Sequence, residues 1–179
     1  MSRPLPAGVA AALGAWLAVV GLHRTFELWL SRRNARRLAA RGGIERSARH
    51  FPAIVAVHAL FPLALAAEVV VLGARPGAAW PAWVLLLAAA EALRLAAMRA
   101  LGERWNVRIW VVPGEPPVRR GIYRWLRHPN YLGVAIEFVA APLAFGAWRT
   151  AVLFSALGLW TLTVRVRAED RALEGRVPA

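Results

Sequence analysis

The stretch GIYRWLRHPNYLGV, residues 121–134, gathers side chains that can bind a charged ligand that carries a ring. Arg127 and His128 can hold an anionic group by charge or by hydrogen bonding. Aromatic faces that can stack on a purine ring or an organic cation come from Tyr123, Trp125 and Tyr131. Arginine, tyrosine and tryptophan are also the usual residues of a membrane–water interface, so the composition of the stretch alone leaves both interpretations open.

A proline divides this stretch into two predicted helices. Pro129 lacks an N–H group and disfavours helical geometry in the residue before it, yet proline suits the first position of a helix. We therefore expect a short helix from Gly121 to Arg127 and a second helix that begins at Pro129, with His128 as its cap. Free backbone N–H groups at residues 130–132 and the helix dipole then favour an anion at this point.

The composition indicates a membrane protein. Of 179 residues, 59% are hydrophobic, which is too many for a soluble domain of this size. The 23 basic residues are all arginine and outnumber the 10 acidic ones. They lie between apolar runs, so we expect contact with anionic lipid headgroups and no nucleic acid. Cysteine is absent and the four histidines lack ligand spacing, so no metal site is expected.

Five apolar runs predict the fold. They are residues 5–22, 51–72, 79–98, 131–147 and 150–164. A spanning helix needs about 20 apolar residues, and the first three runs reach that length. We predict an all-α, polytopic membrane protein with about five transmembrane helices in a single domain, residues 1–179. Residues 1–98 hold the first three spans, and residues 99–179 hold a ligand-binding loop, a helical hairpin and a tail.

The arginines predict the orientation of these spans. With the amino terminus outside, only Arg3, Arg75 and Arg149 lie on the outer side, and the carboxyl terminus is cytoplasmic. The expected location is the inner membrane of a bacterium. We interpret the first run as an uncleaved span, and residues 23–43 as a basic amphipathic helix anchored to headgroups. A tight link at residues 148–150 joins the last two runs.

Residues 121–134 resemble the signature of the isoprenylcysteine carboxyl methyltransferase family, in which G-x-Y-x-x-x-R-H-P-x-Y-x-G recurs. The fixed positions are Gly121, Tyr123, Arg127, His128, Pro129, Tyr131 and Gly133. The family's second element is an arginine and paired acids just after the last span, followed by a leucine. The corresponding residues in RVRAEDRAL are Arg165, Glu169, Asp170 and Leu173. Asp170 replaces the more usual second glutamate, and the resemblance covers about residues 99–175.

The resemblance implies an enzyme that binds S-adenosylmethionine at the cytoplasmic face and methylates a lipophilic acceptor from the bilayer. S-adenosylhomocysteine would be the second product. The cofactor contacts expected by position and by side-chain chemistry are Val118, Tyr123, Arg127, His128, Pro129, Asn130, Tyr131 and Glu169. Arg165 falls where the family has an arginine linked to the acceptor and to catalysis. Within the family, the string 104–134 looks most like bacterial members that O-methylate alkylpyrones and phenolic lipids.

The acceptor's chemistry decides whether a base is needed. A carboxylate acceptor needs only Arg165 to hold it in line with the methyl group. A phenol or enol must lose a proton, and then His128 could assist as a base. Alternatively, Arg165 could lower the pKa of the acceptor itself. The sequence leaves both routes open, so the predicted catalytic residues are Arg165 and His128.

Ionisable side chains within the predicted spans are expected to face the interior of the bundle, because they are costly in lipid. They are His58, Glu68, Glu91 and Glu137. Glu91 and Arg94 are three residues apart, a spacing that allows an ion pair on one helix. Glu137 either lines an acceptor tunnel or ties helices together. We expect the apolar wall of that tunnel from Phe138, Phe145 and Trp160, although each could equally face lipid.

Two other functions remain open at this stage. Sterol reductases and steroid 5α-reductases share a similar arginine–histidine–proline string but bind NADPH. An additional basic pocket for the 2′-phosphate of NADPH is not obvious in this chain, and RVRAED after the last span favours the methyltransferase. The second alternative is a non-catalytic membrane protein, which would bind no cofactor.

Overall fold

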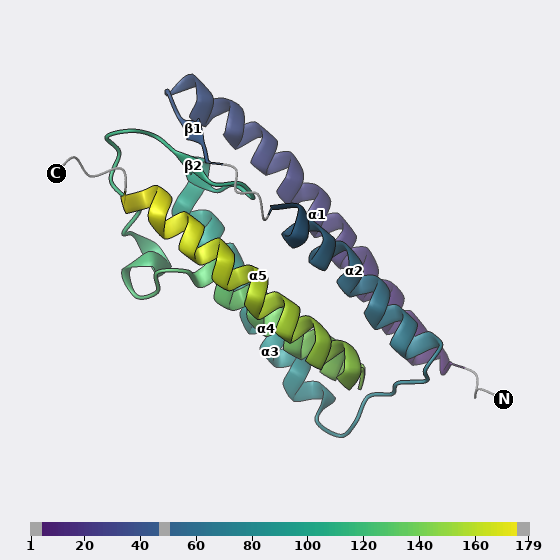
Figure 1. The fold of residues 1–179 in the computed structure, drawn as a ribbon. Coiled ribbons are helices and arrows are strands. Elements are labelled where there is room, and N and C mark those ends of the chain that lie inside the picture. The colour runs from purple at the N-terminus through teal and green to yellow at the C-terminus, as the bar shows by residue number, and fades with distance from the viewer. Residues whose placement is uncertain (1–4, 47–50, 175–179) are drawn as a thin grey trace.

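The computed structural model describes residues 5–46 and 51–174, which form a helical bundle with a small strand pair at one end (Figure 1). The five helices of this part of the chain are α1 (Ala7–Ala40), α2 (Phe51–Val70), α3 (Trp80–Leu101), α4 (Pro129–Ala144) and α5 (Trp148–Glu174). Two short strands, β1 (Ile44–Glu45) and β2 (Trp110–Val111), pair antiparallel, with Ile44 opposite Val111. The 3₁₀ turns are η1 (Gly102–Arg104) and η2 (Gly121–Arg124). The prediction of an all-α fold is confirmed.

The helices differ in how readily they could cross a bilayer. Within the described residues, α1, α2 and α5 are long and apolar enough to span a membrane. Helix α4 has 16 residues, which is shorter than the roughly 20 that a perpendicular span needs. The first turn of α1 and the last turn of α5 lie at opposite ends of the bundle (Figure 1). This arrangement is compatible with about five spans and with termini on opposite sides.

Residues 23–40 do not form a separate surface helix. They continue α1 without a break, so that α1 runs for 34 residues. The side chains of this half that are buried lie three or four positions apart, on one helix face, and are Glu27, Ser31, Asn34 and Leu38. The segment therefore docks on the protein itself, while its arginines, such as Arg33 and Arg36, project outward.

The link between the last two helices lies three residues earlier than predicted. Helix α4 ends at Ala144 and α5 already begins at Trp148, so that residues 145–147 form the turn. Glu68 on α2 explains this start. Its carboxylate accepts hydrogen bonds from the backbone N–H groups of Arg149 and Thr150 at 3.1 and 2.6 Å, and from the Thr150 hydroxyl at 2.6 Å. A carboxylate there also suits the positive end of the helix dipole.

The hydrophobic core lies between α2, α4 and α5, with α1 along one side. The rings of Phe61 and Phe138 meet edge to face at 4.9 Å, and Phe154 stands 5.4 Å from Phe61. Phe138 and Phe145 belong to this packed core, whereas Trp160 is 57% exposed on the outside. None of the three predicted tunnel residues lines the cavity described below, so this prediction is wrong.

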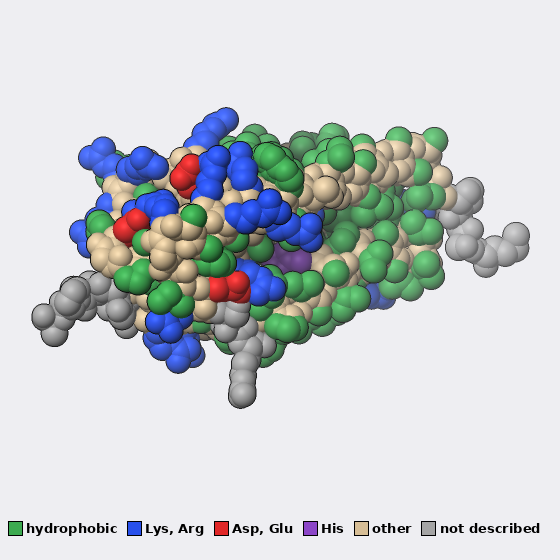
Figure 2. Space-filling model, turned by 90° about the horizontal axis from the view of Figure 1, so that it is seen from above, with side chains coloured by type: hydrophobic (Ala, Val, Ile, Leu, Met, Phe, Trp, Pro, Cys, Tyr) green, Lys and Arg blue, Asp and Glu red, His purple; other side chains and the backbone are tan. Residues whose placement is uncertain are grey.

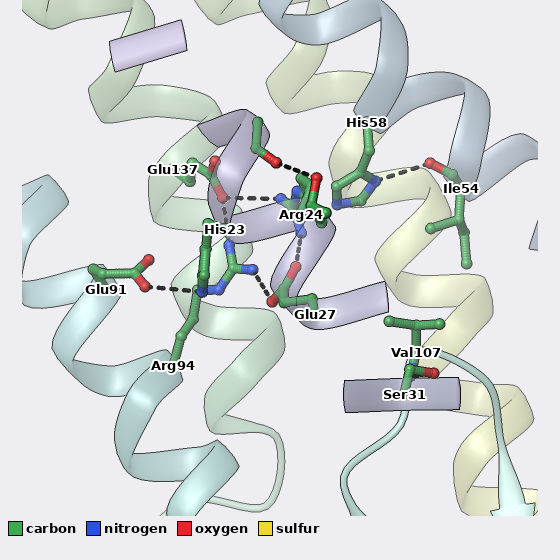
Figure 3. A network of polar contacts seen from close by, with 12 residues as sticks. His23, Arg24, Glu27, Ser31, Ile54, His58, Glu91, Arg94, Val107 and Glu137 are labelled. Carbon is green, nitrogen blue, oxygen red and sulfur yellow. Dashed lines mark hydrogen bonds and ion pairs between the residues drawn. The ribbon is translucent and has the colours of Figure 1, made fainter. Parts of the chain in front are cut away.

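A polar network crosses the bundle between α1, α3 and α4 (Figure 3). Arg94 binds Glu27 at 2.5 Å and Glu137 at 2.7 Å, and Arg24 also contacts both carboxylates. The predicted pair of Glu91 with Arg94 is wrong, since Glu91 lies 3.3 Å from His23 instead. Glu137 is therefore a tie between helices.

The remaining features of the fold are the contact of His58 and the short elements β2 and η2. The Nδ1 atom of His58 lies 2.8 Å from the carbonyl oxygen of Ile54, one turn back on α2. The largely apolar residues 107–112 contain β2. The helix expected from Gly121 to Arg127 is shorter, because η2 already ends at Arg124.

Candidate active site

A cavity of about 810 Å³ lies at the end of the bundle that carries the strand pair. That volume falls within the range of small-molecule sites, about 300–1,000 Å³. Its walls come from Leu38 at the end of α1, from residues 101–131, and from the last turns of α5. The predicted site residues that line it are Val118, Tyr123, Arg127, His128, Asn130, Tyr131, Arg165 and Glu169. Pro129 is the exception: it is buried at the first position of α4 and shapes the site through the backbone.

Helix α5 brings the second sequence element to this cavity. The helix is 27 residues long and continues well beyond the apolar run 150–164. Arg165, Glu169 and Leu173 therefore lie four residues apart on one face of a single helix, and all three line the cavity. The two elements, 34 residues or more apart in sequence, face one another across the same space.

Arg165, Tyr131 and Glu169 form a hydrogen-bonded chain at the centre of the site. The Nε–H group of Arg165 donates to the Tyr131 hydroxyl oxygen at 3.1 Å. The same hydroxyl donates to the Glu169 carboxylate. Tyr131 thus holds a guanidinium and a carboxylate at fixed positions on one wall, and its own proton is committed to Glu169.

The guanidinium of Arg165 is buried, with 6% of the residue exposed, yet it has no ion pair within the described part of the chain. Its other hydrogen bond also goes to a neutral group, since Nη2–H donates to the carbonyl oxygen of Val107 at 3.0 Å. A buried charge without a counter-charge is unfavourable. Arg165 is therefore positioned to receive an electronegative group in the cavity.

His128 pairs with the less expected acid of the motif. Its Nε2 atom lies 3.2 Å from the Asp170 carboxylate, and its ring stacks on that of Tyr131 at 5.6 Å. Arg127 also approaches Asp170, at 3.8 Å, but its side chain is 85% exposed. Such an exposed ion pair contributes little to the stability of the fold. Arg127 therefore lies at the rim of the cavity, and His128 forms part of its wall.

The start of α4 has the geometry predicted for an anion or polar ligand. His128 holds the cap position, but its side chain is turned to Asp170 and does not cap the helix. The side-chain oxygen of Asn130 is buried and has no hydrogen-bond partner among the described residues. A buried acceptor in this condition costs free energy unless a ligand supplies a donor.

Tyr123 adds a neutral hydrogen-bonding group to the opposite side. Burial, together with the negative charge of Glu169, raises the pKa of the Tyr123 phenol above its ordinary value. The phenol therefore stays protonated at neutral pH and can donate to a ligand.

Several lining residues were missed by the sequence analysis. They are Leu38, Leu101, Arg104, Trp105, Asn106, Arg108, Ile109, Trp110, Val112, Glu115, Pro117, Arg119 and Arg124. Most belong to residues 101–119, part of the segment that was predicted only as a ligand-binding loop. Glu115 accepts hydrogen bonds from Arg41 and binds Arg104 at 2.5 Å, which ties that loop to the end of α1. The sequence did offer one signal for this loop: Glu115 is a single acidic residue between prolines in a region rich in arginine, which favours an ion pair.

Comparison with known proteins identifies the group to which this site belongs. The model of the isoprenylcysteine carboxyl methyltransferase (ICMT) family matches residues 83–175, which is just over half of the chain. The protein belongs to the ICMT family. The match runs from α3 through α5 and so covers every wall of the cavity except Leu38. Its membership in a methyltransferase family, together with the apolar helices, makes it an integral membrane protein of that class.

Two curated relatives extend the similarity to the amino-terminal half. The uncharacterized protein YpbQ of Bacillus subtilis (strain 168) is 37% identical over 161 residues, or 89% of this chain and 96% of the relative. An uncharacterized protein of Haemophilus influenzae (strain ATCC 51907 / DSM 11121 / KW20 / Rd) is 26% identical over 156 residues, or 87% and 91%. No solved structure matches this chain.

Proposed function

We propose that this protein is a membrane-embedded, S-adenosylmethionine-dependent methyltransferase that methylates an oxygen of a lipophilic acceptor. One observation carries the proposal: Arg165 and Glu169 on α5 and the His128–Tyr131 turn on α4 line a single cavity. Membership in the ICMT family supports the reaction class. The acceptor is either an isoprenylcysteine-like carboxylate or the hydroxyl of an alkylpyrone or phenolic lipid.

The residues of the cavity fit the parts of S-adenosylmethionine. Six arginines and three carboxylates line it, so that both the carboxylate and the cationic groups of the cofactor would find partners. The start of α4 and Arg127 suit the carboxylate. Glu169 and the unpaired Asn130 oxygen suit ribose hydroxyls or the ammonium group. Aromatic faces for the adenine and the sulfonium are available from Trp105, Trp110, Tyr123 and Tyr131.

The chain's own residues would act mainly by positioning. S-adenosylmethionine supplies the methyl group on its sulfonium, and the acceptor oxygen takes that methyl in an in-line displacement, which leaves S-adenosylhomocysteine. Arg165 would hold the acceptor oxygen, since its guanidinium has no carboxylate partner in the described residues. A proton from a phenol or enol would pass to His128, which Asp170 holds in place. Correct alignment can supply much of the rate in such a transfer.

We also propose that the arginine-rich end lies at the cytoplasmic face of a bacterial inner membrane and contacts anionic headgroups. Figure 2 shows arginine side chains gathered over one end of the molecule and hydrophobic ones over the remainder of that face. The outward arginines of α1 are at this end, which also carries the cavity. Anionic lipid attracts such clusters at about 1 kcal/mol per residue near the surface.

Cofactor binding is the direct test. Isothermal titration of the purified protein with S-adenosylhomocysteine and, separately, with NADPH distinguishes a methyltransferase from a reductase. We expect S-adenosylhomocysteine to bind and NADPH not to bind. The same titration is done with Glu169→Gln, which removes a charge from the cavity. Glu103→Gln is its matched control, because Glu103 is an exposed acid outside the cavity. Binding of NADPH alone would overturn the proposal, and binding of neither would favour a non-catalytic protein.

The acceptor is found by a second experiment. Purified protein is incubated with methyl-labelled S-adenosylmethionine and a lipid extract of the native cell, and the product is analysed by mass spectrometry. A labelled ester indicates a carboxylate acceptor, and a labelled ether indicates a phenol or enol. A labelled thioether or amine would contradict O-methylation.

A further inference from the structure

A polar stripe on α1 connects the amino-terminal half of the chain to the candidate active site. We define it as Glu27, Ser31 and Asn34, which are all buried on one face of α1. These residues precede residue 83, where the match to the ICMT family begins. Glu27 binds Arg94, whereas Asn34 donates to the carbonyl oxygens of Gly102 and Trp105 at 3.2 and 2.8 Å. Through Asn34, the stripe therefore contacts the segment that forms the cavity wall, which includes Trp105.

Ser31 makes the contacts of the stripe that lie nearest to the proposed chemistry. Its hydroxyl donates to the side-chain oxygen of Asn106 at 2.9 Å and accepts from the backbone N–H of Val107 at 3.3 Å. The Asn106 amide in turn donates to the Ser31 carbonyl oxygen at 2.9 Å. Figure 3 shows Ser31 on α1 directly beside Val107. One of these hydrogen bonds reaches the Val107 N–H and two reach the Asn106 side chain. The side-chain oxygen of Asn106 also accepts from the backbone N–H of Arg108 at 2.9 Å, which belongs to the same peptide unit as the Val107 carbonyl. Ser31 and Asn106 together therefore hold this peptide against α1.

Val107 is one of the two hydrogen-bond partners of Arg165 among the described residues. Its carbonyl oxygen accepts from Arg165 Nη2–H at 3.0 Å, and the Tyr131 hydroxyl is the other partner. Neither partner is a carboxylate, so no strong ion pair holds the guanidinium in place. The Val107 carbonyl and the Tyr131 hydroxyl together therefore decide where the charge of Arg165 lies in the cavity.

We propose that Ser31 is a positioning residue for Arg165, acting through the Val107 peptide. The inference rests on the proposed function, since it assigns Ser31 to the orientation of the acceptor-binding arginine. Loss of the hydroxyl frees Val107 N–H and lets its carbonyl move, so that Arg165 loses its alignment with the acceptor. The cofactor contacts on α4 and Glu169 do not depend on Ser31.

A double-mutant cycle tests this. Initial rates of labelled methyl transfer from S-adenosylmethionine to the lipid extract are measured for wild type, Ser31→Ala, Arg165→Lys and the double variant. We expect Ser31→Ala to lower the rate about tenfold, with the Kd for S-adenosylhomocysteine unchanged within about twofold. In the Arg165→Lys background, the same change should have little further effect, because residues that act as one unit are non-additive.

Thr161→Val is the matched control. Thr161 is a buried hydroxyl on α5 whose hydrogen bonds go only to carbonyls of its own helix. We expect it to retain the wild-type rate. Where Ser31→Ala does not fold, Ser31→Cys takes its place in the cycle, because a thiol fills similar space but forms only weak hydrogen bonds to Asn106 and Val107.

The outcomes separate the two proposals. An active wild type with equal effects of Ser31→Ala in both backgrounds overturns the role of Ser31 and leaves the methyltransferase standing. The same holds if Thr161→Val loses as much activity as Ser31→Ala. A wild type that neither binds S-adenosylhomocysteine nor transfers methyl overturns the proposed function and this inference with it.

Discussion

Two polar clusters in this protein use the same residue types in opposite ways. In the bundle, Arg94 lies between Glu27 and Glu137, and both carboxylates also contact Arg24. Two arginines thus face two glutamates, so the charges there balance, although the Nε–H of Arg94 has no hydrogen-bond partner among the described residues.

At the cavity the pairing is incomplete. Arg165 has no carboxylate partner and Asn130 has a buried oxygen without a donor, within the residues that the structure describes. The first cluster therefore ties helices together, and the second is open to a ligand. Burial and residue type alone do not separate a tie from a site; the pairing of each buried charge with an opposite charge does.

The largest expected effect comes from breaking the bundle cluster. Arg94→Ala leaves two buried carboxylates without their main counter-charge, and we expect a loss of about 3–5 kcal/mol of stability. Thermal unfolding in detergent, followed by circular dichroism, measures it. Arg149→Ala, an exposed arginine outside the cluster, is the control. A melting temperature of Arg94→Ala equal to that of the control would mean that the cluster is not a tie.

Arg165→Ala should lower the activity and leave the stability nearly unchanged, the reverse of Arg94→Ala. We expect methyl transfer to fall about 100-fold, since the group that orients the acceptor is gone, while S-adenosylhomocysteine still binds. The melting temperature should change little, because no carboxylate of the described chain depends on Arg165 for an ion pair. Rates of labelled methyl transfer and calorimetric titration measure the two quantities. A fall in affinity equal to the fall in rate would assign Arg165 to the cofactor.

Glu169→Gln should act on affinity. The amide keeps the shape of the carboxylate but not its charge, and a charged hydrogen bond is worth about 1.5–3 kcal/mol. We expect the Kd for S-adenosylhomocysteine to rise about 20-fold. Calorimetric titration against Glu103→Gln measures the difference. An unchanged Kd would remove Glu169 from the cofactor site.

Arg127→Ala should have the smallest effect. Its side chain is 85% exposed and its contact with Asp170 is 3.8 Å long, so we expect the Kd to change about threefold or less. The change should shrink further as salt is raised, because exposed charges are screened. Titrations at low and high salt check this. A loss as large as that of Glu169→Gln would place Arg127 inside the site after all.

Much of the candidate site was predictable because it depends on local rules. Pro129 ends one segment and begins a helix, since its ring fixes φ and removes a donor. The four-residue spacing of Arg165 and Glu169 places both on one helix face as soon as α5 continues past the membrane run. Four of the motif residues in 121–134 therefore line one cavity as expected, namely Tyr123, Arg127, His128 and Tyr131. Pro129 and the two glycines shape the backbone around it.

The errors arose where distant residues compete. Glu91 and Arg94 satisfy the local rule for a pair, but Glu27 and Glu137 from other helices approach Arg94 in a desolvated interior, where direct contact is far stronger. The start of α5 was misplaced because its capping carboxylate, Glu68, lies on another helix. The second half of α1 was predicted from its arginines, which do project outward, but the sequence did not show that its other face would pack against the protein.

The sequence by itself determined the membrane class, the helices and the residues that carry the family signature, because hydropathy, proline geometry and helical spacing act within one segment. Only the tertiary structure decided which charges meet. Ser31 reaches Arg165 through Val107, and Glu169 reaches it through Tyr131. Such contacts join residues dozens of positions apart, and their energies depend on a burial that exists only once the helices have packed.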